Sequence, residues 1–147
     1  MRCVGIAAAL ALAACARPER EVERAVRAYD EALVVAYRTG DASRMGEVAA
    51  EDEARRVAML VDIKASAQLV LEATIEALEV TRAETVAGPD AAAAETRERW
   101  RYFDRHLRPG EAPGPTIVSE MTMRYDLVRV GGRWKVSAVK TLARHGP

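Results

Sequence analysis

The feature that most constrains this fold is a change in the spacing of apolar residues near Leu69. Before that point they recur at steps of three and four, as in Val22, Val26, Tyr29 and Leu33. This spacing places apolar side chains on one face of an amphipathic helix. After Leu69, apolar and polar residues alternate, which is typical of strands with one buried face. The sequence therefore predicts helices first and strands second.

Three helices are expected before the change in spacing. The first ends at Gly40, which suits the left-handed position after a helix, and Asp41 is a candidate N-cap for the second helix. This second helix is short and contains Met45 and Val48. A longer helix starts near Glu51, and its expected buried residues are Val57, Leu60, Val61 and Ile63.

Four strands are expected after the change. Turn residues separate them at Gly88-Pro89-Asp90, in the loop 108–115 and at Gly131-Gly132. The alternating residues are Leu78, Val80 and Val86 in the first strand, the run 91–107 in the second, residues 117–127 in the third, and Trp134, Val136 and Ala138 in the fourth. Amphipathic helices must cover the apolar face of such a sheet. The predicted fold class is α+β, with three N-terminal helices packed on a four-stranded antiparallel sheet.

The run 91–107 has two different faces because side chains alternate along a strand. One face carries Ala92, Ala94, Thr96, Glu98, Trp100 and Tyr102. The other carries a basic row of Arg97, Arg99, Arg101 and Arg105. Such a row is either a solvated sheet face or a basic surface for anionic lipid, a cell-wall polymer or an acidic protein.

The first 15 residues resemble an export signal. Arg2 precedes an uncharged apolar run that is too short to cross a bilayer, and small residues follow it. Its last four residues, Leu12-Ala13-Ala14-Cys15, resemble the lipobox of bacterial lipoproteins, in which the cysteine is acylated and becomes the new N-terminus. We predict a signal peptide at 1–14, a short tether at 15–20 and one domain at 21–144. The alternatives are a chance cysteine or cleavage near Ala16 that releases a free protein.

Removal of this leader would leave 133 residues, the size of one domain. Only one cysteine would remain, so an intramolecular disulfide is not expected, and His106 and His145 make a weak case for a metal site. Residues 15–96 contain 10 Lys and Arg against 17 Asp and Glu, and residues 97–147 contain 11 against 5. The whole chain is neutral, which argues against nucleic acid as a partner.

The closing segment 123–136 has the pattern Tyr-x-Leu-x-Arg-x-x-Gly-x-Trp-x-Val. Together with the helical first half, it resembles the nuclear transport factor 2-like (SnoaL-like) cone fold, in which a curved sheet wraps around helices. The segment 98–102, followed by that hairpin, is similar to the C-terminal domain of plastid-division proteins and its bacterial relatives of unknown role. This resemblance implies a cone-shaped fold with a cavity, but it implies no single activity, because the fold hosts enzymes and binding modules alike.

Enzymes of this fold use carboxyl groups inside the cone as base and acid. The candidates here are Asp30, Glu98, Asp104 and His106. Glu98 shares a face with Trp100, so it is either a catalytic acid or a structural carboxylate paired with an arginine such as Arg82 or Arg124. The candidate cavity residues are Tyr29, Glu98, Trp100, Tyr102, Tyr125 and Trp134. No catalytic motif, cofactor or metal is predicted.

The resulting hypothesis is a lipid-anchored protein of the bacterial envelope with a non-enzymatic binding domain. Its partners are expected to be the membrane through acylated Cys15, an envelope protein or anionic polymer, and a second copy through the sheet face. The alternative is a small-molecule carrier, or an isomerase or dehydratase, that uses the cone cavity. An open cavity with an unpaired Glu98 would favour this alternative, and a filled cone with Glu98 bridged to arginine would favour the binding domain.

Overall fold

The structure, a computed structural model, describes residues 18–145. In this part of the chain the helices are α1 (Pro18–Thr39), α2 (Met45–Val48) and α3 (Glu51–Ser66). The strands are β1 (Leu69–Thr85), β2 (Ala91–His106), β3 (Ile117–Val130) and β4 (Arg133–His145). The predicted fold class is confirmed. Because α1 begins at Pro18, the last three residues of the predicted tether are helical.

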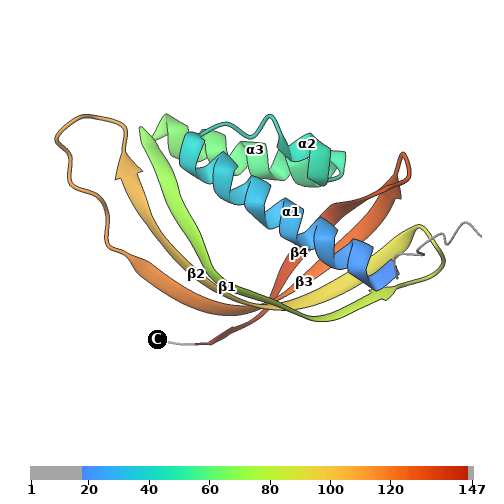
Figure 1. Ribbon diagram of the computed structural model, residues 1–147. Coiled ribbons are helices and arrows are strands. Elements are labelled where there is room, and N and C mark those ends of the chain that lie inside the picture. The colour runs from blue at the N-terminus through green and yellow to red at the C-terminus, as the bar shows by residue number, and fades with distance from the viewer. Residues whose placement is uncertain (1–17, 146–147) are drawn as a thin grey trace, which may run out of the picture.

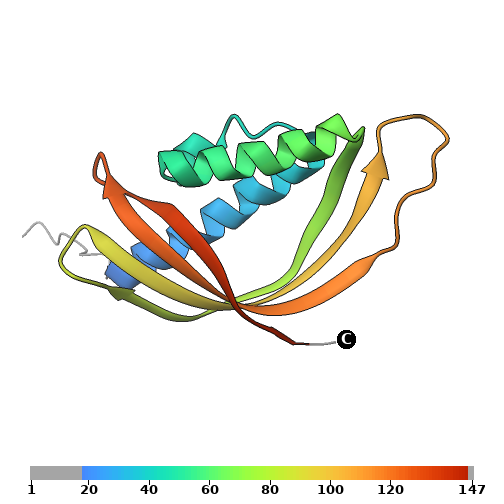
Figure 2. The same ribbon diagram turned by 180° about the vertical axis from the view of Figure 1, so that it is seen from behind.

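The sheet is antiparallel throughout, in the order β1-β2-β3-β4. It bends strongly, and all three helices lie on its concave side, with α1 closest to the strands (Figure 1). The view from behind shows the same arrangement, with the two ends of the sheet rising on either side of α1 (Figure 2). The concave face of the sheet and the apolar face of α1 therefore enclose the interior.

Bulges interrupt the outer strands of this sheet. Register shifts occur between Ile75 and Ala77 and between Val80 and Arg82 on β1. The β3–β4 register shifts near Asp126 and again near Thr122. A bulge bends a strand and reverses its alternation for the residues beyond it. The expected alternation on β4 is therefore wrong beyond Val136, where Val139 instead of Ala138 lies on the inner face.

The core forms where α1 and α3 meet the sheet. Every residue of the buried core cluster lies between Val22 and Val136, so a chain starting at Ala16 contains all of it. The prediction that Leu60 and Ile63 are buried is wrong, because only Val57 and Val61 of the four apolar residues face inward. Residues four apart share a helix face, whereas Ile63, two positions after Val61, lies on the opposite side.

Two turns match their expected chemistry. Gly40 has φ 73°, and its amide donates to the carbonyl of Ala36, which closes the end of α1. Gly131 and Gly132 both have positive φ, as a two-residue hairpin turn requires. Asp41 differs from expectation: it accepts a hydrogen bond from the Ser43 amide at 2.8 Å, but α2 starts later, at Met45. Asp41 thus stabilises the turn and is not the N-cap of α2.

Candidate functional site

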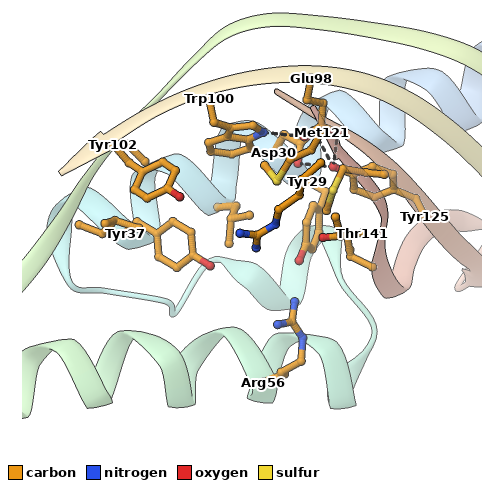
Figure 3. A pocket seen from close by; sticks show the side chains of 16 residues that line it. Tyr29, Asp30, Tyr37, Arg56, Glu98, Trp100, Tyr102, Met121, Tyr125 and Thr141 are labelled. Carbon is orange, nitrogen blue, oxygen red and sulfur yellow. Dashed lines mark hydrogen bonds between the residues drawn. The ribbon is translucent and has the colours of Figure 1, made fainter. Parts of the chain in front are cut away.

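A cavity of about 350 Å³ lies between α1, α3 and the concave face of the sheet. Its apolar wall combines Leu33 from α1 with residues of all four strands, and phenol rings and two arginines complete the lining. Figure 3 shows the labelled side chains that converge on this space, with Tyr37, Tyr102 and Trp100 on one side and Tyr125 on another. The lining residues are Tyr29, Asp30, Leu33, Tyr37, Arg56, Leu71, Ala73, Glu98, Trp100, Tyr102, Met121, Met123, Tyr125, Val139, Thr141 and Arg144. The cone is therefore open and is not filled by its own side chains.

A buried polar network forms one end of the cavity. The Tyr125 hydroxyl lies 2.7 Å from Glu98 Oε1 and 3.0 Å and 3.2 Å from the two oxygens of Asp30 (Figure 3). Trp100 Nε1 donates to Glu98 Oε2 at 2.6 Å, and the Thr96 hydroxyl donates to Glu98 Oε1. Asp30 and Tyr125 are 1% exposed and Glu98 is 2% exposed. Two carboxyl groups therefore share one phenol in a site nearly closed to water.

Counting hydrogens assigns the protonation of this network. A phenol has one hydrogen, so Tyr125 can donate to only one of its two carboxyl neighbours. Glu98 is the closer one and also faces the Trp100 and Thr96 donors, so it is the carboxylate. Asp30 must then be a neutral acid that donates to the Tyr125 oxygen, because two ionised carboxylates would otherwise meet around one hydrogen. The network carries one negative charge, on Glu98.

The electrostatic surroundings agree with this assignment. Burial raises the pKa of Asp30 well above its usual range, and the nearby charge of Glu98 raises it further. Burial and the charges of Asp30 and Glu98 also raise the pKa of Tyr125. These directions agree with a protonated Asp30 and a protonated Tyr125.

A second network, buried at Tyr29 and Glu53, lies beside the first. Tyr29 donates a short hydrogen bond to Glu53 on α3, and Arg56 donates to both oxygens of Glu53, at 2.8 Å and 2.6 Å. Burial and this bond to Glu53 raise the pKa of Tyr29. The rings of Tyr29 and Tyr125 meet edge to face, with centroids 6.0 Å apart. This contact connects the two networks and couples α3 to the sheet through α1.

The structure brings together most of the candidate cavity residues. Tyr29, Glu98, Trp100, Tyr102 and Tyr125 all line the cavity, whereas Trp134 does not. Trp134 packs in the core near the hairpin, with the Arg129 guanidinium 4.5 Å from its ring centroid. The position of Trp134 near the β3–β4 turn places it away from the cavity, although its face of the strand was correctly predicted.

The prediction that an arginine such as Arg82 or Arg124 pairs with Glu98 is wrong. Arg82 pairs with Glu84, and Arg124 pairs with Asp126 and Glu95. Arg124 lies opposite Glu95 in the register, on the outer face of the sheet, and Arg82 also lies opposite Glu95. Glu98 is on the inner face, so neither arginine can reach it. The partners of Glu98 are neutral donors instead.

The basic row is largely paired with glutamates. Arg99 bonds Glu76 at 2.9 Å and Glu120 at 2.7 Å, while Arg101 and Arg105 bond Glu76 and Glu72. The Arg99 guanidinium holds the pKa of Glu76 below its usual range. The interpretation of this row as a strongly basic surface is therefore not supported, because cross-strand glutamates neutralise most of it. Arg97 has no ion pair among residues 18–145.

The remaining candidates lie outside the cavity. Asp104 pairs with Lys64 at 2.6 Å, and His106 pairs with Glu111. Cys15, and with it the lipobox, falls outside the described residues. Within residues 18–145, no cluster of three His, Cys, Asp or Glu residues suits a metal ion, and no helix has the length and hydrophobicity needed to cross a bilayer.

The sequence interpretation did not anticipate the surroundings of three site residues. Asp30 was a candidate carboxyl group, but nothing in the sequence showed that it would be fully buried. Glu53 sits among the acidic residues of the first turn of α3, where it could not be told from a solvated neighbour. Arg144 reaches the cavity through a bulge that no sequence signal marks.

Comparison with known proteins gives the fold a name. No family model matches the sequence, and no curated protein matches it. The intermembrane-space region of the chloroplast protein ARC6 superposes with a TM-score of 0.76 at 21% identity, covering 85% of this chain and 96% of that one. A ketosteroid isomerase-like protein from Erwinia carotovora atroseptica gives 0.55 at 11% identity, covering 87% and 98%. A proposed dehydratase of the NTF2-like family from Streptomyces avermitilis gives 0.50 at 15% identity, covering 86% and 99%.

The fold is nuclear transport factor 2-like. The fold expected from the closing hairpin is thus confirmed. At these identities the NTF2-like neighbours establish architecture alone, because this fold supports many unrelated activities. Function must therefore be argued from the cavity and its side chains.

Proposed function

We propose that this chain is an exported, lipid-anchored binding protein whose cone cavity takes up a small, largely apolar molecule without converting it. The observation that carries this proposal is an open cavity of about 350 Å³ whose buried polar end is satisfied by its own residues. That volume lies within the range of about 300 to 1,000 Å³ typical of small-molecule sites. Methionine and aromatic side chains on its walls adapt well to apolar ligands.

The hydrogen count supports binding over catalysis. Stabilising a developing oxyanion requires donors that point at the substrate. In the network, the hydrogens of Asp30, Tyr125, Trp100 and Thr96 are all used among the network's own residues. Glu98, the carboxylate that would act as a base, holds three of these hydrogen bonds. A substrate would have to break this network before chemistry could begin.

The second candidate function is catalysis in the same cavity. The observation that favours it is a neutral acid, Asp30, in contact with a phenol, Tyr125, beside the carboxylate of Glu98. Two structural neighbours named for enzymes, the ketosteroid isomerase-like protein and the proposed dehydratase, share this fold and make catalysis the second candidate. We prefer binding because the hydrogen bonds of Asp30, Tyr125 and Glu98 are satisfied within the network, so no donor is left for a substrate.

Filling the cavity tests the binding proposal. Ala73 lines the cavity on β1, and Ala77 lies on the same strand outside it. In the chain starting at Ala16, affinity for straight-chain alcohols should rise by about 0.8 kcal/mol per CH₂ until the cavity is full. Ala73→Phe should lower the affinity for decanol about tenfold or more, and Ala77→Phe should leave it unchanged, as measured by calorimetric titration.

Circular dichroism and thermal unfolding would verify that both variants are folded. If neither variant changes the affinity for decanol, the alcohol binds elsewhere. If the wild-type chain binds no alcohol of any length, the cavity is not a site for apolar molecules. Either result would contradict the proposed function.

The anchor rests on Leu12-Ala13-Ala14-Cys15 and is tested separately. Two or three acyl chains, each contributing about 0.8 kcal/mol per buried CH₂, would hold the domain firmly on a membrane. Expressed in a bacterium, the wild-type protein should incorporate a fatty-acid probe and partition into detergent, whereas Cys15→Ser should do neither. Cys3→Ser is the matched control and should label normally, since Cys3 lies in the segment expected to be removed. Equal labelling of wild type and Cys15→Ser would refute the anchor.

A further inference from the structure

We infer that the cavity ligand carries a carboxylate at one end of an apolar body and that Arg144 binds this group. The inference rests on the proposed function, since it names the class of molecule that the cavity takes. It begins from a local irregularity of β4. Arg144 is a cation in the lining of the cavity, next to the apolar side chains of Met121 and Val139.

A bulge brings Arg144 to the cavity. Val139 and Thr141 line the cavity and pair with Tyr125 and Met123, so simple alternation would make Ala143 the next inward residue. The register shifts by one residue near Leu142, and Arg144 instead pairs with Met121 and lines the cavity. Bulges of this kind re-aim side chains and are common near binding sites. The extra residue therefore exchanges an inward alanine for an inward arginine.

Arg144 is available to a ligand. Among residues 18–145 it forms no ion pair, and its side chain is exposed at the cavity mouth. The nearest acidic residue in its register row is Glu98, two strands away across Met121. Glu98 is already bonded to Tyr125, Trp100 and Thr96, so it does not neutralise Arg144.

The other arginine of the cavity differs in this respect. Arg56 donates to both oxygens of buried Glu53, at 2.8 Å and 2.6 Å, and this bond raises the pKa of its guanidinium. Arg56 is thus part of the wall, whereas Arg144 retains its hydrogen-bonding capacity. A guanidinium matches a carboxylate with two parallel hydrogen bonds, which makes a carboxylate the best-fitting anion for a single arginine.

The side chains that line the cavity indicate the chemistry of the rest of the ligand. The apolar part of the lining offers no hydrogen bonds to a polar chain; it consists of Leu71, Met121, Met123 and Val139. The indole NH of Trp100 is already bonded to Glu98. An amphiphile would place its apolar body among these side chains and its charged end beside Arg144 at the mouth. Such a ligand leaves the buried network of Asp30, Tyr125 and Glu98 intact.

The experiment compares two probes that differ only at one end, decanoate and decanol. In calorimetric titrations at pH 7.5 with the chain starting at Ala16, decanoate should bind about tenfold more tightly than decanol. Arg144→Gln should remove this preference and leave decanol binding within twofold of wild type. Arg97→Gln, which removes an equal charge from the outer face, should change neither.

A composition-matched variant tests the role of the bulge. The double substitution Ala143→Arg and Arg144→Ala keeps the charge of the chain but moves the guanidinium to the outward position, so it should lose the preference as completely as Arg144→Gln. Equal binding of decanoate and decanol by wild type, or a preference that survives in either Arg144 variant, would overturn the carboxylate inference while leaving the cavity a binding site. If neither probe binds, the proposed function fails as well.

Discussion

Replacing Asp30 by asparagine should make the domain more stable at pH 8, whereas replacing Glu98 by glutamine should destabilise it by about 1 to 3 kcal/mol. Asparagine reproduces the hydrogen that neutral Asp30 donates to Tyr125, and it cannot ionise. Glutamine instead turns an NH₂ group toward donors that now bond the Glu98 carboxylate, so at least one buried donor loses its acceptor. The two amide substitutions should therefore change the free energy of unfolding in opposite directions.

The pH dependence arises from the raised pKa of Asp30. In the unfolded chain this carboxyl ionises near 3.8, and in the folded domain it stays protonated to a much higher pH. Its contribution to stability is therefore fully present below about pH 3.8 and is lost as the pH rises toward the folded pKa. The advantage of Asp30→Asn over wild type should grow between pH 4 and pH 8.

Chemical denaturation of both variants and wild type at pH 4, 6 and 8 would measure these differences. A carbon-detected NMR titration of the Asp30 carboxyl would locate its proton directly. If Asp30→Asn is as destabilising as Glu98→Gln at every pH, the shared proton is not on Asp30. The assignment of donor and acceptor in the cavity would then have to be reversed.

Replacing Trp134 by alanine should lower the free energy of unfolding by about 3 to 5 kcal/mol, the cost of removing a large aromatic side chain from a core. Trp134 is 8% exposed and packs where β4 meets the helices, with Arg129 over its ring. Trp134→Phe should cost much less, because it keeps an aromatic ring and removes an indole NH that has no hydrogen-bond partner.

Urea denaturation of the chain starting at Ala16 would check this result. Val130→Ala is a suitable control, since it also shortens an apolar side chain near the hairpin but at an exposed position, and it should change stability by less than about 0.5 kcal/mol. A loss below about 1 kcal/mol for Trp134→Ala would mean that the hairpin contributes little to the core.

The architecture was predictable because it depends on patterns that are local in sequence. The stripe of Val22, Val26 and Tyr29 is a property of one helix, and the Gly131-Gly132 turn is a property of one hairpin. Each predicts its own element, and four consecutive strands joined by two short turns and the loop 107–116 leave few ways to pair. The inward face of β2 was also predictable, because buried and exposed residues alternate from Thr96 to Arg101 and no register shift interrupts the pairing of β2 with β3.

The partners of the buried side chains were not predictable in the same way. Glu98 was expected to meet an arginine, yet the register places Arg124 opposite Glu95, on the other face of the sheet. A bulge of one residue reverses the face of every subsequent side chain, and no sequence signal marks where the bulges of β1 and β4 fall. The bulge that turns Arg144 inward is of the same kind.

The sequence by itself determined the order of helices and strands, the turns and the set of residues on the inner face of β2, since apolar spacing and glycine conformation act over a few residues. The tertiary structure alone decided that Asp30, Tyr125 and Glu98 form one hydrogen-bonded network, that Glu53 joins Tyr29 and Arg56, and that Arg144 reaches the cavity. These contacts join α1, α3 and strands up to 95 positions apart. They depend on the curvature and register of the whole sheet, where bulges of one residue decide which side chains meet.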